Sequence, residues 1–411
     1  MAGQVLPGVV NHLLKDNYFA NRVAQLQANA FLLSKRTLAL YGLFFVITGV
    51  SLTSIAYGAQ SAPYYAVLAI GLLACMPLLL RRSDEQRKVF FFILLLMSLP
   101  LFLFFIQVYV FSFRGEFEAS IMASLAMSYV FFIVGVGVLL RPEEFQKLMM
   151  LTAGAHVLIG VYGIIQWDFE DARYAYSRFA ALDLHIAVWA EIALGMVIAA
   201  ILSGKRNILA VSLVVAAILI YGTQMRSAGI AIVTAIGVLL VLGVKGRARI
   251  ILIATTVVMT VIGIGLYWSD VRDVASALLL LDNPHRGLDT GFSGRFGNWA
   301  DGFAMFMLSP IVGVGPIDPV AGYTHNGIIR LMAQYGVLFG FFLLVLYLVS
   351  LKRALRLRDP LLLAALIGYL AYIMTAPRVV NLQVMPLVAL FAVAYALNGK
   401  ILHNSQPPKQ A

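Results

Sequence analysis

The chain places a histidine, an asparagine and an arginine close together at the start of a strongly apolar run. The segment reads GYTHNGIIRLMAQYGVLFG and contains His325, Asn326 and Arg330. A neutral imidazole, with an ordinary pKa of about 6.5, can act as a general base near neutral pH. Asn326 suits two roles, because asparagine is a preferred helix cap and can also bind a ligand. Arg330 is costly in an apolar run unless it pairs or faces a watery cavity. We predict His325 as a catalytic base, with Asn326 and Arg330 binding substrate.

Two further arginines also lie next to apolar segments of the chain. Arg226, in YGTQMRSAGIA, falls in a tight turn between two apolar runs, and Arg295, in FSGRFGNW, begins a predicted short helix. Arg226 can also serve as an interfacial anchor whose head extends to water. Helix stability gives no reason for Arg295, because an arginine near a helix N-terminus opposes the dipole. Since the guanidinium grips phosphate or carboxylate with two parallel hydrogen bonds, Arg226 and Arg295 predict an anionic ligand.

The elements that carry these residues must be membrane helices. The chain is 61% hydrophobic and 12% charged, about half the charged fraction of a soluble protein. Apolar runs of about 20 residues, the length that crosses a bilayer, recur along the whole chain. Because lipid offers the backbone no hydrogen-bond partners, each run must be helical. The sequence predicts an all-α polytopic membrane protein of about twelve transmembrane helices, centred near residues 48, 72, 100, 130, 156, 194, 215, 236, 259, 339, 368 and 392.

The charges predict the orientation. The net charge is +11, but the basic clusters RRSDEQRK, KGRAR and LKRALRLR fall in alternate loops, and every Lys lies on the same side as these clusters. This bias is a topology signal rather than a nucleic-acid footprint, and it places both termini in the cytoplasm. The first apolar run has no small-residue cleavage site after it, which predicts no removable signal peptide. The single Cys75 falls in a predicted span and suggests packing only.

One outer loop is far longer than a connection requires, and long loops in compact proteins are usually functional or disordered. Its segments VRDVASALLLL and GRFGNWADGFAMFML predict two short helices, and SPIVGVGPIDP a rigid stretch leading to His325. We therefore expect a folded cap over the membrane domain. The predicted divisions are a cytoplasmic segment 1–36, helices one to nine in 37–268, a periplasmic loop 269–324, helices ten to twelve in 325–402, and a cytoplasmic tail 403–411.

Three motifs together resemble a known family. THNGIIRLMAQYGVLFG is similar to the His-Asn…Gly signature of the bacterial O-antigen ligase and polymerase superfamily. SGRFGNWADGFAMFMLSPIVGVGP resembles the Gly-Arg…Trp…Pro…Gly-x-Gly loop that precedes that signature, and TQMRSAGIA resembles the family's short Arg-containing turn. The resemblance covers these motifs, their order, the long periplasmic loop and the twelve-span layout. It carries the family pattern onto Arg226, Arg295 and His325.

The resemblance implies glycosyl transfer at the periplasmic face of the bacterial inner membrane. The donor would be a glycan on undecaprenyl diphosphate, and the acceptor, for a ligase, a sugar hydroxyl of lipid A-core. The family uses no nucleotide sugar, and the sequence contains no nucleotide or metal motif. We therefore expect no cofactor and no metal.

The residues fit this chemistry. A lipid diphosphate is already a good leaving group, so the main requirement is positive charge to stabilise it, with His325 as the base for the attacking hydroxyl. Such a single displacement inverts the anomeric centre, which we prefer. Retention would need a carboxylate nucleophile, and the outer side offers Asp168, Asp183, Asp301 and Asp318. An apolar groove is expected for the polyprenyl tail.

Other functions stay open at this point. An O-antigen polymerase would use nearly the same residues with a second lipid-linked repeat unit as acceptor. A protein O-oligosaccharyltransferase would use a Ser or Thr hydroxyl. A transporter of an anionic amphiphile is the non-enzymatic alternative, but transporters often carry their polar groups near mid-membrane. Here only His156 and Glu191 are placed to lie that deep, and neither is assigned a role.

Overall fold

The computed structural model describes residues 37–49, 140–167, 186–223, 225–243, 291–314, 324, 326–376 and 388–397, with isolated positions at 52, 66, 67, 70, 88, 91 and 246. Every regular element within these residues is an α-helix. The main helices are α5 (Pro142–Ile165), α6 (Ile186–Ser203), α7 (Arg206–Thr223), α8 (Arg226–Gly243), α11 (Gly291–Leu308), α13 (Gly327–Leu357) and α14 (Pro360–Thr375), and shorter helices cover Thr37–Gly49 and Val388–Leu397.

The helix starts follow the local sequence. At α5 the backbone N–H of Arg141 donates to Glu144 Oε2 at 2.9 Å, and Pro142 occupies the first turn. At α14 the Asp359 carboxylate accepts from two backbone N–H groups, at 3.0 and 3.1 Å. Both patterns satisfy amide groups that have no partner within the helix, and a proline at the first helical position loses no hydrogen bond.

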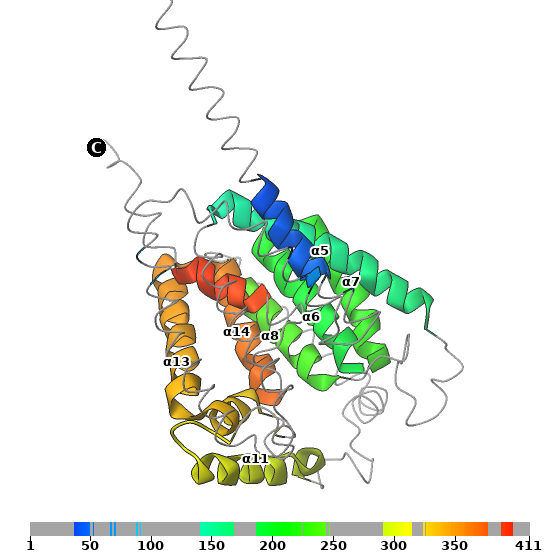
Figure 1. Ribbon diagram of the computed structural model, residues 1–411. Coiled ribbons are helices and arrows are strands. Elements are labelled where there is room, and N and C mark those ends of the chain that lie inside the picture. Colours follow the sequence, from blue (N-terminus) through cyan, green and yellow to red (C-terminus); the bar gives the residue numbers. More distant parts are fainter. Residues whose placement is uncertain are drawn as a thin grey trace, which may run out of the picture.

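The bundle is organised around α6. Every residue from Trp189 to Ser203 is buried, as expected of a helix that is apolar on all sides. α5, α7, α8 and α14 all contact it, and Figure 1 shows α6 among these helices. Glycines allow close approach: a Cβ at Gly163 of α5 would overlap the Trp189 ring, and one at Gly160 would meet Val215 of α7.

α8 and α14 pack through small residues. The buried side of α8 is formed by Ser227, Ala228, Ala231, Ile232 and Ala235. A Cβ at Gly368 of α14 would lie 2.7 Å from the Ala235 Cβ. In lipid the hydrophobic effect does not drive apolar helices together, so their association depends on close packing. Small residues allow this packing because they let the helix backbones approach closely.

The outer surface of the bundle is apolar. α5, α7 and α8 are each long and apolar enough to cross a membrane, and their exposed residues include Leu158, Val214 and Val233. The chain is therefore an integral membrane protein. Helices occur at the predicted spans near 48, 156, 194, 215, 236, 339, 368 and 392, whereas the predictions near 72, 100, 130 and 259 fall almost entirely outside the described residues.

Two contacts fix the direction of α14. A Cβ at Gly204, in the turn after α6, would lie 3.5 Å from Leu361 at the start of α14. Near the other end of α14, the Tyr372 hydroxyl donates to Glu191 Oε1 at 3.0 Å, close to the start of α6. α14 is thus antiparallel to α6. Because two tight turns make α8 parallel to α6, α14 ends beside the start of α8.

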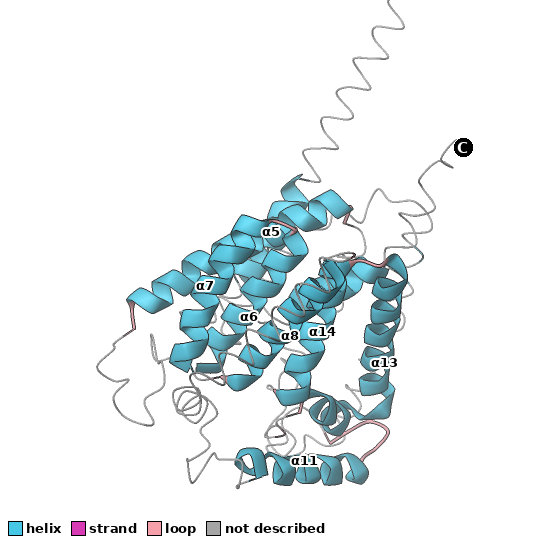
Figure 2. Cartoon of the chain, turned by 180° about the vertical axis from the view of Figure 1, so that it is seen from behind, coloured by secondary structure: helices cyan, strands magenta, loops and turns pink. Residues whose placement is uncertain are grey.

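α11 lies across one end of the bundle. It contacts α13, and Figures 1 and 2 both show it running transverse to the long helices beneath α13 and α14. The predicted second short helix of the loop is therefore present. It begins at Gly291 rather than at Arg295, four residues earlier than the prediction.

Candidate functional site

Three helix ends bring the predicted polar residues to one end of the molecule. Arg226 is the first residue of α8, Asn326 caps the start of α13, and Asn326 Nδ2 donates to the carbonyl of Met374 in the last turn of α14 at 3.3 Å. We call this the site end. The sequence predicted Arg226 in the turn between two apolar runs, and the structure places it as the first residue of the second run's helix. The predicted place of Asn326, at the start of the tenth apolar helix, is confirmed.

The opposite end of the bundle is basic. Lys205 and Arg206 lie at the start of α7, and Arg356 and Arg358 lie at the end of α13. Arg353 donates to the carbonyl of Leu397 and so joins α13 to the last short helix. We call this the basic end. It lies one helix length, about 27 Å for an 18-residue helix, from the site end.

Both the oxygen and the nitrogen of the Asn326 amide group form hydrogen bonds within the protein. Its Oδ1 accepts from the backbone N–H groups of Ile328 and Ile329 at 3.0 and 3.1 Å, while its Nδ2 reaches Met374. The side chain is 4% exposed. The cap interpretation is therefore confirmed, and the substrate-binding role of Asn326 stays a prediction.

Replacing Asn326 by alanine should lower stability by about 1 kcal/mol, the usual contribution of an N-cap. Asn326→Asp keeps the capping oxygen and loses only the donor to Met374, so it should retain most of the cap's contribution. Thermal unfolding in detergent micelles would compare the two variants. Equal loss in both would show that the bond to α14, and not the cap, carries the stability.

Arg330 has a polar partner that the sequence analysis missed. Its Nε donates to Gln334 Oε1 at 3.2 Å, and Gln334 is buried. A polar partner is one of the two conditions that make an arginine tolerable in an apolar run, the other being a watery cavity. The spacing contained the signal, because residues four apart lie side by side on a helix.

α13 is broken at Gly336. This residue has φ 68° and ψ −177° within an otherwise helical run, and Figure 1 shows the short first segment turned relative to the long second one. A Gly-x-x-x-Gly spacing such as that in GVLFG is typical of a close helix contact. Gly336 and Gly340 do not lie on one continuous helix face, however, so this interpretation does not hold for Gly336. Gly340 does allow close approach, since a Cβ there would meet Met332 of the first segment.

The break is held by the turn that follows α11. The Val337 N–H donates to the Pro310 carbonyl, and the Val314 N–H donates to the Ala333 carbonyl, both at 2.8 Å. Gly313 and Gly336 make this possible, because each has a positive φ and a Cβ on either would overlap backbone atoms of the other segment. We call this paired contact the glycine clasp. It fixes the short segment that contains Arg330.

α11 approaches the start of α13 through Gly302. A Cβ there would overlap the buried Thr324 side chain and would lie 3.1 Å from Ile329. Position 295 is seven residues earlier on α11, so its Cα lies on the same helix face, about 10 Å along the axis. Asp301 is exposed and, six residues after position 295, lies on another face of α11.

Two predicted site residues are not placed by the structure. His325 and the side chain of Arg295 fall outside the described residues, so their roles stay predictions. The same holds for Asp168, Asp183, Asp318 and the predicted helix VRDVASALLLL. In the chain, His325 stands between Thr324 and Asn326, which are both buried at the site end.

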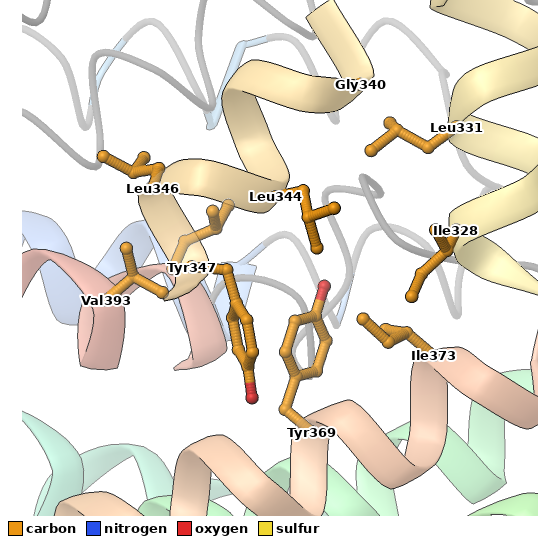
Figure 3. Close-up of a pocket in the computed structure, with 10 residues that line it drawn as sticks. Ile328, Leu331, Gly340, Leu344, Leu346, Tyr347, Tyr369, Ile373 and Val393 are labelled. Atoms are coloured by element: carbon orange, nitrogen blue, oxygen red, sulfur yellow. The ribbon is translucent and has the colours of Figure 1, made fainter. Parts of the chain in front are cut away.

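An apolar pocket begins one turn below the Asn326 cap. Ile328 and Leu331 from the first segment of α13 face Tyr369 and Ile373 of α14 across it, with an empty volume of about 590 Å³ that includes open space at its mouth. In Figure 3 the Tyr369 hydroxyl points into this space, whereas the Tyr347 hydroxyl donates to the Leu366 carbonyl.

The two deep polar residues have structural partners. His156 Nδ1 lies 2.7 Å from the Thr152 carbonyl one turn earlier in α5, and Glu191 accepts from Tyr372. Among the described residues, no group of three or more His, Cys, Asp or Glu side chains is gathered as a metal site requires.

Comparison with curated proteins gave no match. A family model did match, over the segment that begins in α7 and ends in α13, and that segment contains Arg226, Arg295, His325, Asn326 and Arg330. Residues 211–345 match the family model described as O-antigen ligase (Wzy_C), and this part of the chain is therefore similar to that family.

Proposed function

We propose that the protein is an O-antigen ligase, which transfers a glycan from undecaprenyl diphosphate to a sugar hydroxyl of lipid A-core at the periplasmic face of the inner membrane. One observation carries this proposal: the family match at 211–345 spans the starts of α8 and α13, which lie together at the site end. A diphosphate carried in the membrane would meet its acceptor at the membrane surface, where the helix ends of the site end lie.

The proposed reaction is a single inverting displacement without metal. The acceptor oxygen attacks the anomeric carbon and forms the new glycosidic bond, while the bond from that carbon to the phosphate oxygen breaks. The diphosphate leaves with the electron pair, and the hydroxyl proton passes to His325. Arg226 and Arg295 stabilise the negative charge that grows on the diphosphate. Arg330 and Asn326 complete the substrate-binding set.

The distribution of charge supports a periplasmic site. The basic end carries Lys205, Arg206 and the arginines at the end of α13, and positive residues favour the cytoplasmic side. The site end would then face the periplasm, with both termini in the cytoplasm. The pocket between Leu331 and Tyr369 suits part of the polyprenyl chain, because its lining is almost wholly apolar.

Reconstitution tests the proposal. The purified protein would be mixed with a lipid-diphosphate-linked glycan and lipid A-core, in the presence of EDTA and without nucleotide. We expect the glycan to appear on the core. Chains that lengthen on the lipid carrier would indicate a polymerase, transfer to an added protein acceptor a protein O-oligosaccharyltransferase, and lipid movement without a covalent product a transporter.

Arg226→Ala should lower transfer by about 10²-fold, as loss of one charge-stabilising group commonly does. Arg226→Lys keeps the charge but not the fork that holds two phosphate oxygens, so it should recover only part of the rate. Arg206→Ala is the matched control, because Arg206 is an exposed arginine at the basic end. An equal loss of transfer in Arg226→Ala and Arg206→Ala would show that Arg226 is not part of the site.

Gln334→Ala should reduce transfer about tenfold or more, because a hydrogen bond to a charged group contributes roughly 1.5–3 kcal/mol. Gln334→Glu keeps the acceptor for Arg330 Nε and should be less impaired. The double variant with Arg330→Ala should be no worse than Arg330→Ala alone, since contacting residues do not act additively. Additive losses would mean that Gln334 acts independently of Arg330.

A further inference from the structure

α11 presents its apolar residues outward, the reverse of a helix on a water-exposed surface. Phe303, Met307 and Leu308 are 56%, 59% and 74% exposed, and Ala300 and Ala304 are also exposed. Their spacing at i, i+3, i+4, i+7 and i+8 makes one continuous helix face. We call this the α11 stripe. The inward face instead carries Gly302, packed on Thr324, and the partly buried Asn298 and Trp299.

The α11 stripe continues into an apolar face of α13. After α11 the chain reaches Ile311, which is 63% exposed, and the Pro310 carbonyl accepts from Val337 N–H. Val337 begins the second segment of α13, whose exposed residues Phe341 and Val345 follow at four-residue spacing. The exposed apolar surface of a transverse helix and that of a long helix are therefore joined through a backbone hydrogen bond.

We propose that the α11 stripe is a lipid-contacting surface, so that α11 lies in the membrane interface at the site end with Phe303, Met307 and Leu308 in the outer part of the acyl-chain region. Lipid is the occupant because the stripe is continuous with the apolar surface of α13. The bundle of which α13 is part also exposes similar residues on the helices that are long and apolar enough to cross a membrane. A helix lying in the interface inserts its apolar face by about 5–10 Å. This inference is independent of the reaction proposed above.

Single-cysteine labelling tests the surface directly. The chain has one cysteine, so Cys75→Ala gives a cysteine-free background for Met307→Cys and, as a second variant, Leu308→Cys. An environment-sensitive fluorophore would be attached, and the protein placed in phosphatidylcholine nanodiscs with or without brominated acyl chains. Val233→Cys is the lipid-facing control: it lies on α8, about 10 Å along the axis from Arg226, and is 73% exposed. Lys205→Cys, in an exposed turn, is the water-facing control.

We expect brominated lipid to quench the labels at 307 and 308 about as strongly as the label at 233, and far more than the label at 205. Quenching at the level of Lys205→Cys would overturn the proposal. So would oxidative cross-linking of Met307→Cys between two copies together with weak quenching, which would make a second copy the occupant. Val233→Cys confirms in parallel that the labelled protein is folded in lipid, and the result does not depend on transfer activity.

Discussion

His325→Ala should abolish measurable glycan transfer while leaving the protein folded and able to bind donor. General base catalysis contributes about 10²–10⁴-fold, and no other His falls within the segment Arg295–Asn326. The measurement is single-turnover transfer from a lipid-diphosphate-linked glycan to lipid A-core, with donor binding determined separately. Loss of transfer with intact donor binding is the expected result.

Chemical rescue distinguishes a base from a structural histidine. Added imidazole should restore part of the transfer in His325→Ala and none in Arg226→Ala, because only the first variant lacks a proton acceptor. If His325→Ala transfers at the parent rate, the base lies elsewhere. If it loses donor binding and is not rescued, His325 belongs to the binding surface and the proposed proton transfer is wrong.

Gly336→Ala should have an effect of similar size through the backbone alone. Gly336, with φ 68° and ψ −177°, lies in a backbone region that is essentially restricted to glycine and costs another residue roughly 1–3 kcal/mol. The added Cβ would also overlap the Ile311 carbonyl. The glycine clasp must then open and release the segment that holds Arg330. Because misplacing catalytic groups by about 1 Å can cost around 10²-fold, transfer should fall to the limit of detection, with a lower unfolding temperature.

The matched control is Gly237→Ala in α8. A Cβ at Gly237 meets nothing within 4 Å, and alanine favours a helix over glycine by about 1 kcal/mol, so this variant should be as active as the parent. Gly313→Ala should disrupt the same glycine clasp from the turn after α11, because its Cβ would overlap the Gln334 carbonyl. Full activity in both clasp variants would show that the break does not position the site.

The sequence was most informative where one residue decides a local structure. Asn326 predicted the start of α13 because its amide caps free N–H groups, and the apolar runs predicted the helices of the bundle. The turn at Arg226 followed from a polar group between two apolar runs.

The break at Gly336 could not be predicted in the same way. A Gly-x-x-x-Gly spacing suits both a helix contact and a helix break, and the choice depends on the turn at Pro310 and Ile311, which comes from another part of the chain. Gln334 was missed for a different reason. Its spacing from Arg330 on a predicted helix was visible, but the sequence did not show that Gln334 is buried.

The bond from Asn326 to Met374 also bears on how the protein is made. Chains are synthesised from the N-terminus, so Arg226 and Asn326 enter the membrane well before the last turn of α14 leaves the ribosome. The start of α13 therefore lacks its partner in α14 until synthesis has passed residue 374. A partly synthesised chain would hold every predicted catalytic and binding residue and still lack the hydrogen bond that joins α13 to α14 at the site end.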